Sequence, residues 1–308
     1  MLATPFSSVN GTIVRSYSAW ITLLRAYFGL TSRVLPGVAR QHAERLFTRP
    51  PQYRGRQPLP VPARRETVAT STHELSVWQT GPASAPAVLL AHGWGGRGVQ
   101  MGRFVEPLLE RGYRVVWFDQ PGHGESGHGP VGLPDLSSAL HALTVTHGPF
   151  HTAIGHSLGA AAIALALRGR LPVRRVVFLS PPASMNEHTR DFARRLCITS
   201  RVREAMRTRL ENRYRLPFAE IDRIEELEHV RIPALFVHDN DDSEVPIEHA
   251  RRLSAHMAGA RLIRTHGLGH HRIVRDPAVV RAVIDFIQGN DSALPAELPE
   301  LPVPAPMM

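Results

Sequence analysis

A single serine stands at a predicted sharp turn between a strand and a helix. Residues 150–154 mix apolar and β-branched side chains as buried strands do, and the alanine-rich run 160–167 is typical of a buried helix. Gly155 and Gly159 flank Ser157 at the turn, where a Cβ would collide with the strand or the helix. We expect a strained backbone that holds the Ser157 hydroxyl above the carboxyl end of a sheet, beside unpaired N–H groups of the helix start. A serine so placed can act as a nucleophile.

Residues 155–159 resemble the Gly-x-Ser-x-Gly nucleophile elbow of the α/β-hydrolase superfamily. The resemblance covers roughly residues 66–288, and the chain carries an oxyanion loop, a serine, an acid and a histidine in the order that the family requires. It implies a hydrolase in which Ser157 attacks an acyl carbonyl.

A glycine-rich loop, His92-Gly93-Trp94-Gly95-Gly96, follows the third predicted strand. By its position the resemblance implies that the backbone amides of Trp94 and Leu158 stabilise a developing oxyanion. We interpret His92 as a structural residue that hydrogen-bonds within the loop, and not as a base.

The segment 119–126 resembles the Asp-x-Pro-Gly-His-Gly-x-Ser loop of the same superfamily, where its role is structural. We therefore assign no catalytic role to Asp119 or His123.

The acid is expected on the loop after the penultimate strand, where residues 239–244 offer four carboxylates. The family pattern His-Gly-x-x-Asp-x-x-Val-Pro implies Asp242, but this chain carries Asp239 where glycine is usual. We rank Asp242 first, Asp239 second and Asp241 third, and expect Glu244 to be solvated. Crowding of like charges should raise the pKa of at least one of these groups.

The base is expected after the last strand, where residues 265–271 contain three histidines. The family form Gly-x-Gly-His implies His270, with His271 as the alternative. Zinc held by His266, His270 and His271 is the competing interpretation. We disfavour it because the cluster stands where the base is due, and we expect neither a metal nor a cofactor.

Short apolar segments alternate with helical patterns, which favours a mostly parallel, doubly wound α/β sheet. The predicted strands are residues 66–71 and 74–80, as a hairpin, and then 87–91, 113–118, 150–154, 173–179, 232–237 and 260–264.

Four regions are predicted along the chain. Residues 1–65 form an N-terminal helical segment and a Pro/Arg-rich linker; 66–182 and 231–289 form the α/β core; 183–230 form a helical cap; and 290–308 form a disordered, Pro-rich tail. We interpret the helical periodicity of residues 16–46 as ordinary packing on the outside of the domain, in preference to a membrane-surface or substrate-lining element.

The formal net charge is +9, yet every basic residue is arginine and the excess is spread widely, so specific nucleic-acid binding is not expected. One cysteine, Cys197, excludes an intrachain disulfide and fits a reducing compartment. The apolar stretch 19–30 is too short to span a bilayer. We expect a cytoplasmic protein with a small-molecule acyl substrate; the oligomeric state is not indicated.

The leading hypothesis is therefore a serine hydrolase, of the carboxylic-ester hydrolase class, that acts through a Ser-His-Asp triad and an acyl-enzyme. An acyltransferase or thioesterase would use the same intermediate with another acceptor or acyl donor. A ligand-binding protein that keeps this fold without turnover is the third hypothesis.

Overall fold

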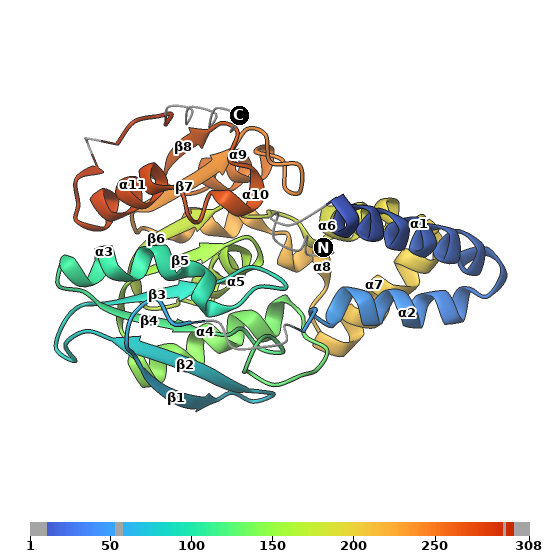
Figure 1. Cartoon of the computed structure of the whole chain (residues 1–308), viewed down its shortest axis with the longest axis horizontal. Coiled ribbons are helices and arrows are strands. Elements are labelled where there is room, and N and C mark those ends of the chain that lie inside the picture. The colour runs from blue at the N-terminus through green and yellow to red at the C-terminus, as the bar shows by residue number, and fades with distance from the viewer. Residues whose placement is uncertain (1–10, 53–57, 292–293, 299–308) are drawn as a thin grey trace.

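The computed structural model describes residues 11–52, 58–291 and 294–298, with the side chains described from residue 20 onward. Its centre is an eight-stranded sheet of order β1-β2-β4-β3-β5-β6-β7-β8 (Figure 1). The strands are β1 Arg64–Ala69, β2 Glu74–Thr80, β3 Ala87–Ala91, β4 Arg114–Phe118, β5 Phe150–His156, β6 Val173–Leu179, β7 Ala234–Asp239 and β8 Arg261–Thr265. Strand β2 pairs antiparallel with β1 and β4, and all other pairings are parallel, as the sequence predicted.

Alternate residues of the central strands face two separate apolar cores. Leu89 of β3 and Phe118 of β4 belong to one cluster, while Leu90 and Trp117 belong to the other. Helices cover both faces of the sheet, because strands with apolar residues on each side must be buried on each side. The helices are α3 Val105–Glu110, α4 Leu133–His147, α5 Leu158–Arg168, α9 Glu248–Ala255, α10 Gly269–Arg272 and α11 Pro277–Ile287, with a 3-10 helix η1 Gly98–Phe104 before α3.

The interval between β6 and β7 is helical, as predicted. It contains α6 Met185–Arg195, α7 Ser200–Tyr214, α8 Phe218–Ile221 and the 3-10 helix η2 Ile224–His229. The N-terminal helices α1 Gly11–Val34 and α2 Pro36–Thr48 pack beside this insertion, so that α1, α2, α6 and α7 form a helical lobe to one side of the sheet (Figure 1). The N-terminal segment therefore joins the insertion, which the sequence did not predict.

The region between α2 and the sheet is irregular where it is described. Residues 49–52 and 58–63 contain neither helix nor strand, and residues 53–57 lie outside the described residues. The first strand begins at Arg64, two residues earlier than predicted.

The predicted disordered tail is wrong for residues 294–298. The N–H of Arg264 in β8 donates to the carbonyl of Ala296 at 3.0 Å, and the N–H of Leu298 donates to the carbonyl of Arg264 at 2.9 Å. Strand β8 is the edge of the sheet, and an edge strand offers unpaired backbone groups that a passing segment can satisfy. Residues 292–293 and 299–308 lie outside the described residues.

Among the helices of the described ranges, none is long and apolar enough to cross a membrane.

Candidate active site

Ser157 is the residue between β5 and α5, and its backbone conformation is rare for a residue other than glycine. Its φ is 53° and its ψ is −124°. The strain is tolerated because the N–H of Ser157 donates to the carbonyl of Leu179 in β6 at 2.9 Å, and its carbonyl accepts from the N–H of Ala161 in α5 at 3.1 Å. The elbow is thus held by the neighbouring strand and by the helix that it begins.

The two flanking glycines are required by close backbone contacts. A Cβ on Gly155 would lie 2.6 Å from the Cα of Ala160, and a Cβ on Gly159 would lie 2.4 Å from the carbonyl oxygen of His92. The expected collisions are confirmed, with one difference: the backbone that contacts Gly159 is that of the end of β3, and not that of the strand before the elbow.

Replacing Gly159 with alanine is expected to destabilise the protein by roughly 2–3 kcal/mol, because backbone atoms cannot move aside as side chains can. Chemical denaturation measures this change. Gly37→Ala is the matched control, since no atom of the described residues lies within 4 Å of a Cβ built at Gly37 in α2. Equal unfolding midpoints for the two variants would contradict the predicted contact between the elbow and β3.

Three of the predicted site residues meet at the carboxyl end of the sheet. The Nε2 atom of His270 lies 2.9 Å from the Oγ of Ser157, and its Nδ1 lies 2.7 Å from Oδ2 of Asp242. All three residues are buried, with exposed fractions of 1% for Ser157, 5% for His270 and 7% for Asp242. The Nδ1–H of His270 can donate to the carboxylate, which leaves Nε2 free to accept the serine proton.

Asp242 is held as an ionised carboxylate. Burial alone would raise its pKa, but hydrogen bonds from His238 and His270 and from the N–H of Val245 outweigh burial and keep the pKa well below its usual range. The backbone N–H groups of Glu244 and Val245 each donate to Oδ1 at 2.9 Å. The carboxylate therefore stays charged at neutral pH and presents Oδ2 to His270.

The other two aspartates of the loop point elsewhere. Asp239 accepts from the Thr265 hydroxyl at 2.6 Å and from the N–H of Leu268 at 2.9 Å. Asp241 accepts from the N–H of Gly267 at 2.9 Å. Both carboxylates join the end of β7 and the loop after it to the end of β8 and the loop after it, which leads to His270.

The expectation that Glu244 is solvated is wrong. Its side chain is 16% exposed and its Oε1 lies 2.7 Å from Nε2 of His271. Burial opposes ionisation, but the hydrogen bond from His271 lowers the pKa of Glu244, and the same bond raises the pKa of His271. The predicted rise from like-charge crowding is therefore contradicted at Asp242 and Glu244, because each carboxylate has a histidine partner.

The alternative base and the alternative metal set are not assembled by the fold. His271 points to Glu244, and Nε2 of His266 lies 2.5 Å from Oε1 of Glu297 in the C-terminal segment. In the part of the chain that the structure describes, no group of three or more histidine, cysteine, aspartate or glutamate side chains could hold a metal ion.

Two further histidines support the site and were not assigned this role from the sequence. The Nε2–H of His156, inside the elbow, donates to the carbonyl of His270 at 2.9 Å. Buried His238 donates through Nε2 to the carbonyl of Val245 at 2.8 Å and lies 3.5 Å from Oδ2 of Asp242. Neither contact could be predicted from the sequence, because each depends on the direction in which a side chain points and not on the spacing of residues along the chain.

The glycine-rich loop after β3 lies against the elbow. A Cβ on Gly93 would lie 2.9 Å from the Cβ of Ser157, so the loop approaches the serine as closely as a backbone can. Trp94 follows Gly93, and Leu158 begins α5, where the first N–H groups have no acceptor within the helix. This placement is compatible with the predicted oxyanion role of the Trp94 and Leu158 amides, which stays a prediction.

His92 and the loop after β4 are structural, as predicted. The Nδ1–H of His92 donates to the carbonyl of Gly93 at 2.7 Å, and its Nε2 accepts from the N–H of Gln120 at 2.8 Å. Asp119 accepts from the N–H groups of Gly98 and Glu125 at 2.7 and 2.8 Å. The loop after β4 is therefore joined by hydrogen bonds to the glycine-rich loop after β3 and to Gly98, the first residue of η1.

Two buried neutral histidines of these loops predict loss of stability in acid. Burial lowers the pKa of His92 to about 4 and that of His123 to about 3, from the ordinary value of 6.5. Below pH 6.5 the unfolded chain binds protons that the folded chain does not, so stability falls as the pH falls toward these values. Between pH 6 and 5 each histidine should cost about 1 kcal/mol.

The substitution His123→Asn tests this prediction, because an asparagine amide can replace the Nδ1–H donor that contacts the Pro121 carbonyl at 2.9 Å. The free energy of unfolding, measured by urea titration at pH 6 and pH 5, should depend less steeply on pH in this variant. His128→Asn, at an exposed position, is the control. An unchanged pH dependence for His123→Asn would argue against a neutral His123.

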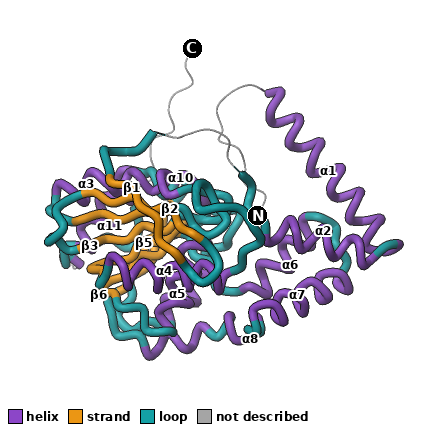
Figure 2. The backbone as a smooth tube through the Cα atoms, turned by 90° about the horizontal axis from the view of Figure 1, so that it is seen from below, coloured by secondary structure: helices purple, strands orange, loops and turns teal. Residues whose placement is uncertain are grey.

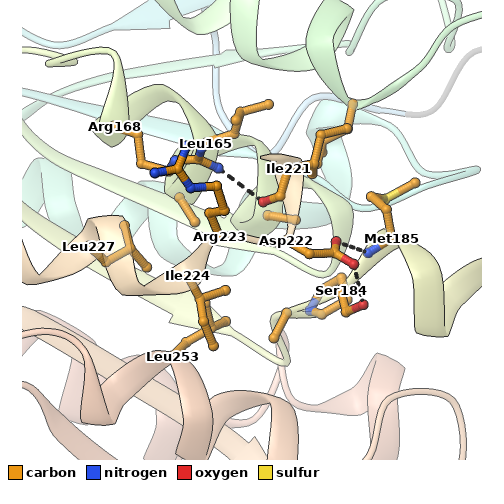
Figure 3. A pocket seen from close by; sticks show the side chains of 15 residues that line it. Leu165, Arg168, Ser184, Met185, Ile221, Asp222, Arg223, Ile224, Leu227 and Leu253 are labelled. Atoms are coloured by element: carbon orange, nitrogen blue, oxygen red, sulfur yellow. Dashed lines mark hydrogen bonds between the residues drawn. The ribbon is translucent and has the colours of Figure 1, made fainter. Parts of the chain in front are cut away.

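A cavity of about 30 Å³ lies apart from this site, between α5 and the insertion (Figure 3). Arg168 of α5 donates to the carbonyl of Ile221 at 3.0 Å. The Asp222 carboxylate accepts from the Ser184 hydroxyl and from the N–H of Met185, each at 2.6 Å (Figure 3). The Arg168 bond attaches the insertion to α5, the helix that begins at the elbow, and the Asp222 bonds join the end of α8 to the start of α6 within the insertion.

Comparison with known proteins agrees with this fold. Residues 86–197 match a family model described as alpha/beta hydrolase fold, and residues 202–296 match one described as TAP-like protein. The esterase Pf2001 of Pyrococcus furiosus has a similar structure, with a TM-score of 0.60 and 19% identity over 78% of this chain and 98% of that chain.

Two curated relatives illustrate the range of sequence similarity. The magnesium-chelatase 30 kDa subunit of Rhodobacter capsulatus is 41% identical over 108 residues, which cover 33% of this chain and only 36% of that protein. The bifunctional esterase/perhydrolase DCH of Acinetobacter calcoaceticus is 24% identical over 241 residues, which cover 62% of this chain and 87% of that protein.

Proposed function

Because the chain belongs to the α/β-hydrolase superfamily, we propose that it is a serine hydrolase that cleaves an ester-like acyl bond through an acyl-enzyme intermediate. The observation that carries the proposal is the continuous contact from Ser157 Oγ through His270 to Asp242, at 2.9 and 2.7 Å. Lengths of 2.6–3.2 Å are those expected between a nucleophile, its base and the group that orients the base.

The first half of the proposed reaction forms the acyl-enzyme. The Ser157 oxygen attacks the acyl carbonyl while its proton passes to Nε2 of His270, and the negative charge develops on the carbonyl oxygen. The amides of Trp94 and Leu158 would donate to that oxygen. Protonated His270, held at Nδ1 by ionised Asp242, then gives its proton to the leaving alcohol, and the bond between the acyl carbon and the leaving oxygen breaks.

The second half repeats these steps with water. His270 takes a proton from the water, whose oxygen attacks the acyl carbon, and the proton then returns to Ser157 as the carboxylic acid is released. The helical insertion would act as a cap that shapes the acyl pocket, because it lies beside the elbow helix and is attached to it through Arg168. A small acyl ester as substrate and a cytoplasmic location are parts of the same proposal.

The experiment that tests the proposal is covalent labelling with a fluorophosphonate probe, followed by mass spectrometry of the labelled peptide. The probe is expected to modify Ser157, with release of one fluoride and no labelling after thermal unfolding. Labelling at another serine, or none in the folded protein, would contradict the assignment.

The acceptor is tested separately by supplying ester and thioester substrates of graded chain length. Release of free acid in proportion to substrate consumed supports hydrolysis. A matching rise in an acylated alcohol or amine, with little free acid, would indicate an acyltransferase, and faster turnover of thioesters would indicate a thioesterase.

A further inference from the structure

Helix α1 and the turn into α2 carry a stripe of exposed apolar side chains. Trp20, Leu23, Leu30 and Val34 are 56%, 63%, 65% and 64% exposed, and their spacing places them along one side of α1. We define the α1 stripe as these four residues together with Leu35, which is 54% exposed, and Val38, which is 40% exposed. These six are among only eight large apolar residues that are exposed in the described part of the chain. Isolated exposed apolar residues are ordinary, but a continuous stripe of this kind indicates a contact surface.

The opposite side of α1 attaches the helix to the protein. Phe28 is fully buried, Leu24 packs against the same core, and Arg25 donates to the carbonyl of Arg195 in α6 at 3.0 Å. Figure 2 shows α1 along the outer edge of the helical lobe. The ordinary packing face that the sequence predicted is therefore present, and the α1 stripe is an additional surface that this packing does not use.

The segment that carries the stripe has an excess of positive charge. Residues 20–48 contain four arginines, Arg25, Arg33, Arg40 and Arg45, against the single carboxylate of Glu44, which lies 3.5 Å from Arg40. Of these arginines, Arg25 lies on the side of α1 opposite the stripe. Arg33 is exposed beside the stripe and donates to the carbonyl of Gly29, which is a neutral group, and it has no carboxylate partner among the described residues. The whole chain carries a net charge of +9.

This combination is complementary to a negatively charged bilayer. A helix with an apolar stripe that includes tryptophan, bordered by arginine, binds in the plane of a membrane surface, with the apolar side chains among the upper acyl chains and the arginines at the phosphates. A second copy of the chain seated on the stripe would instead bring like charges together, which costs free energy. Insertion across the membrane is not indicated, because no helix within the described residues is long and apolar enough.

We propose that the α1 stripe docks the protein onto the surface of an anionic phospholipid bilayer. Trp20, Leu23 and Leu30 enter the boundary between headgroups and acyl chains, and Arg33 contacts lipid phosphate. The helical lobe, and with it the insertion beside the elbow, then faces the membrane.

The test is co-sedimentation of the full chain with vesicles of phosphatidylcholine mixed with phosphatidylglycerol, and with vesicles of phosphatidylcholine alone. The native chain is expected to bind the mixed vesicles more tightly, and added salt should weaken the binding. The double substitution Leu23→Gln and Leu30→Gln should reduce the partition coefficient roughly tenfold or more, since each leucine loses the gain from its burial. Val145→Gln is the matched control, because Val145 is 88% exposed on α4 and lies outside the stripe.

A second variant tests the proposal independently, in case the double substitution unfolds the protein. Arg33→Glu leaves every apolar residue of the stripe in place, and it should weaken binding to the mixed vesicles while binding to phosphatidylcholine changes little. Circular dichroism and thermal unfolding establish that each variant is folded. Three results would overturn the proposal: a native chain that does not bind the mixed vesicles, folded stripe variants that bind as the native chain does, or variants that lose a dimer with no change in vesicle binding.

Discussion

Ser157→Ala is expected to lower kcat/KM for short p-nitrophenyl esters by roughly 10⁴- to 10⁶-fold, the loss that follows removal of a nucleophilic serine. The variant keeps the Cβ, and the backbone N–H that donates to the Leu179 carbonyl is unchanged. The fold and the thermal stability should therefore stay close to those of the native protein. The measurement is steady-state hydrolysis followed by release of p-nitrophenol.

The matched control is Ser84→Ala, at an exposed position before β3. This variant should hydrolyse the esters at the native rate. If Ser157→Ala hydrolysed the esters as fast as the control does, Ser157 could not be the nucleophile. If the native chain itself neither hydrolysed the esters nor reacted with the fluorophosphonate probe, the third hypothesis, a ligand-binding protein without turnover, would gain support.

Asp242→Asn is expected to lower kcat/KM by roughly 10³- to 10⁴-fold, with a loss of stability of roughly 1–3 kcal/mol because the hydrogen bonds to the ionised carboxylate are weakened. An asparagine oxygen can still accept from the N–H groups of Glu244 and Val245, which stabilise the loop. An amide cannot hold the protonated imidazole of His270 as a carboxylate does, and it favours the wrong tautomer of the ring. Hydrolysis rates and unfolding midpoints, measured on the same preparation, separate the two effects.

Asp239→Asn is the informative comparison, because the two aspartates could not be separated from the sequence. Asp239 accepts from Thr265, Leu268 and the N–H of Asp241, and it does not touch His270 within the described structure. Its substitution should cost roughly 1–3 kcal/mol of stability through weakened hydrogen bonds, with a much smaller loss of activity. The reverse result, with activity lost only in Asp239→Asn, would move the acid to position 239.

Features that depend on neighbouring residues could be predicted from the sequence alone. The elbow of residues 155–159 and the order of the strands along the chain follow from local patterns: where glycine is needed, where apolar runs are buried, and where a turn must close. The structural role of the segment 119–126 was implied by its resemblance to a loop of the α/β-hydrolase superfamily. The fold confirms these predictions, with strand boundaries that shift by one or two residues. Ser157 was placed by such a pattern as well, whereas His270 was chosen because residues 267–270 resemble the family form Gly-x-Gly-His.

Features that depend on the direction of a side chain could not be predicted in this way. Three aspartates within four positions differ in what they contact only because the loop after β7 turns against the loop after β8. The same holds for Glu244, which was expected to be solvated and instead contacts His271, and for residues 294–298, which run beside β8. Each of these contacts joins two segments that are distant in the sequence and are brought together by the packing of the fold.

The sequence by itself therefore determined the kind of fold and the candidate nucleophile of this protein, because turns, buried strands and helix starts depend on residues that are adjacent in the chain. The candidate base was implied by the family resemblance. Only the tertiary structure decided which carboxylate reaches His270, which histidines support it, and which side of α1 stays exposed. These depend on how distant segments pack, since hydrogen bonds and burial are set by separation in space and not by separation in sequence.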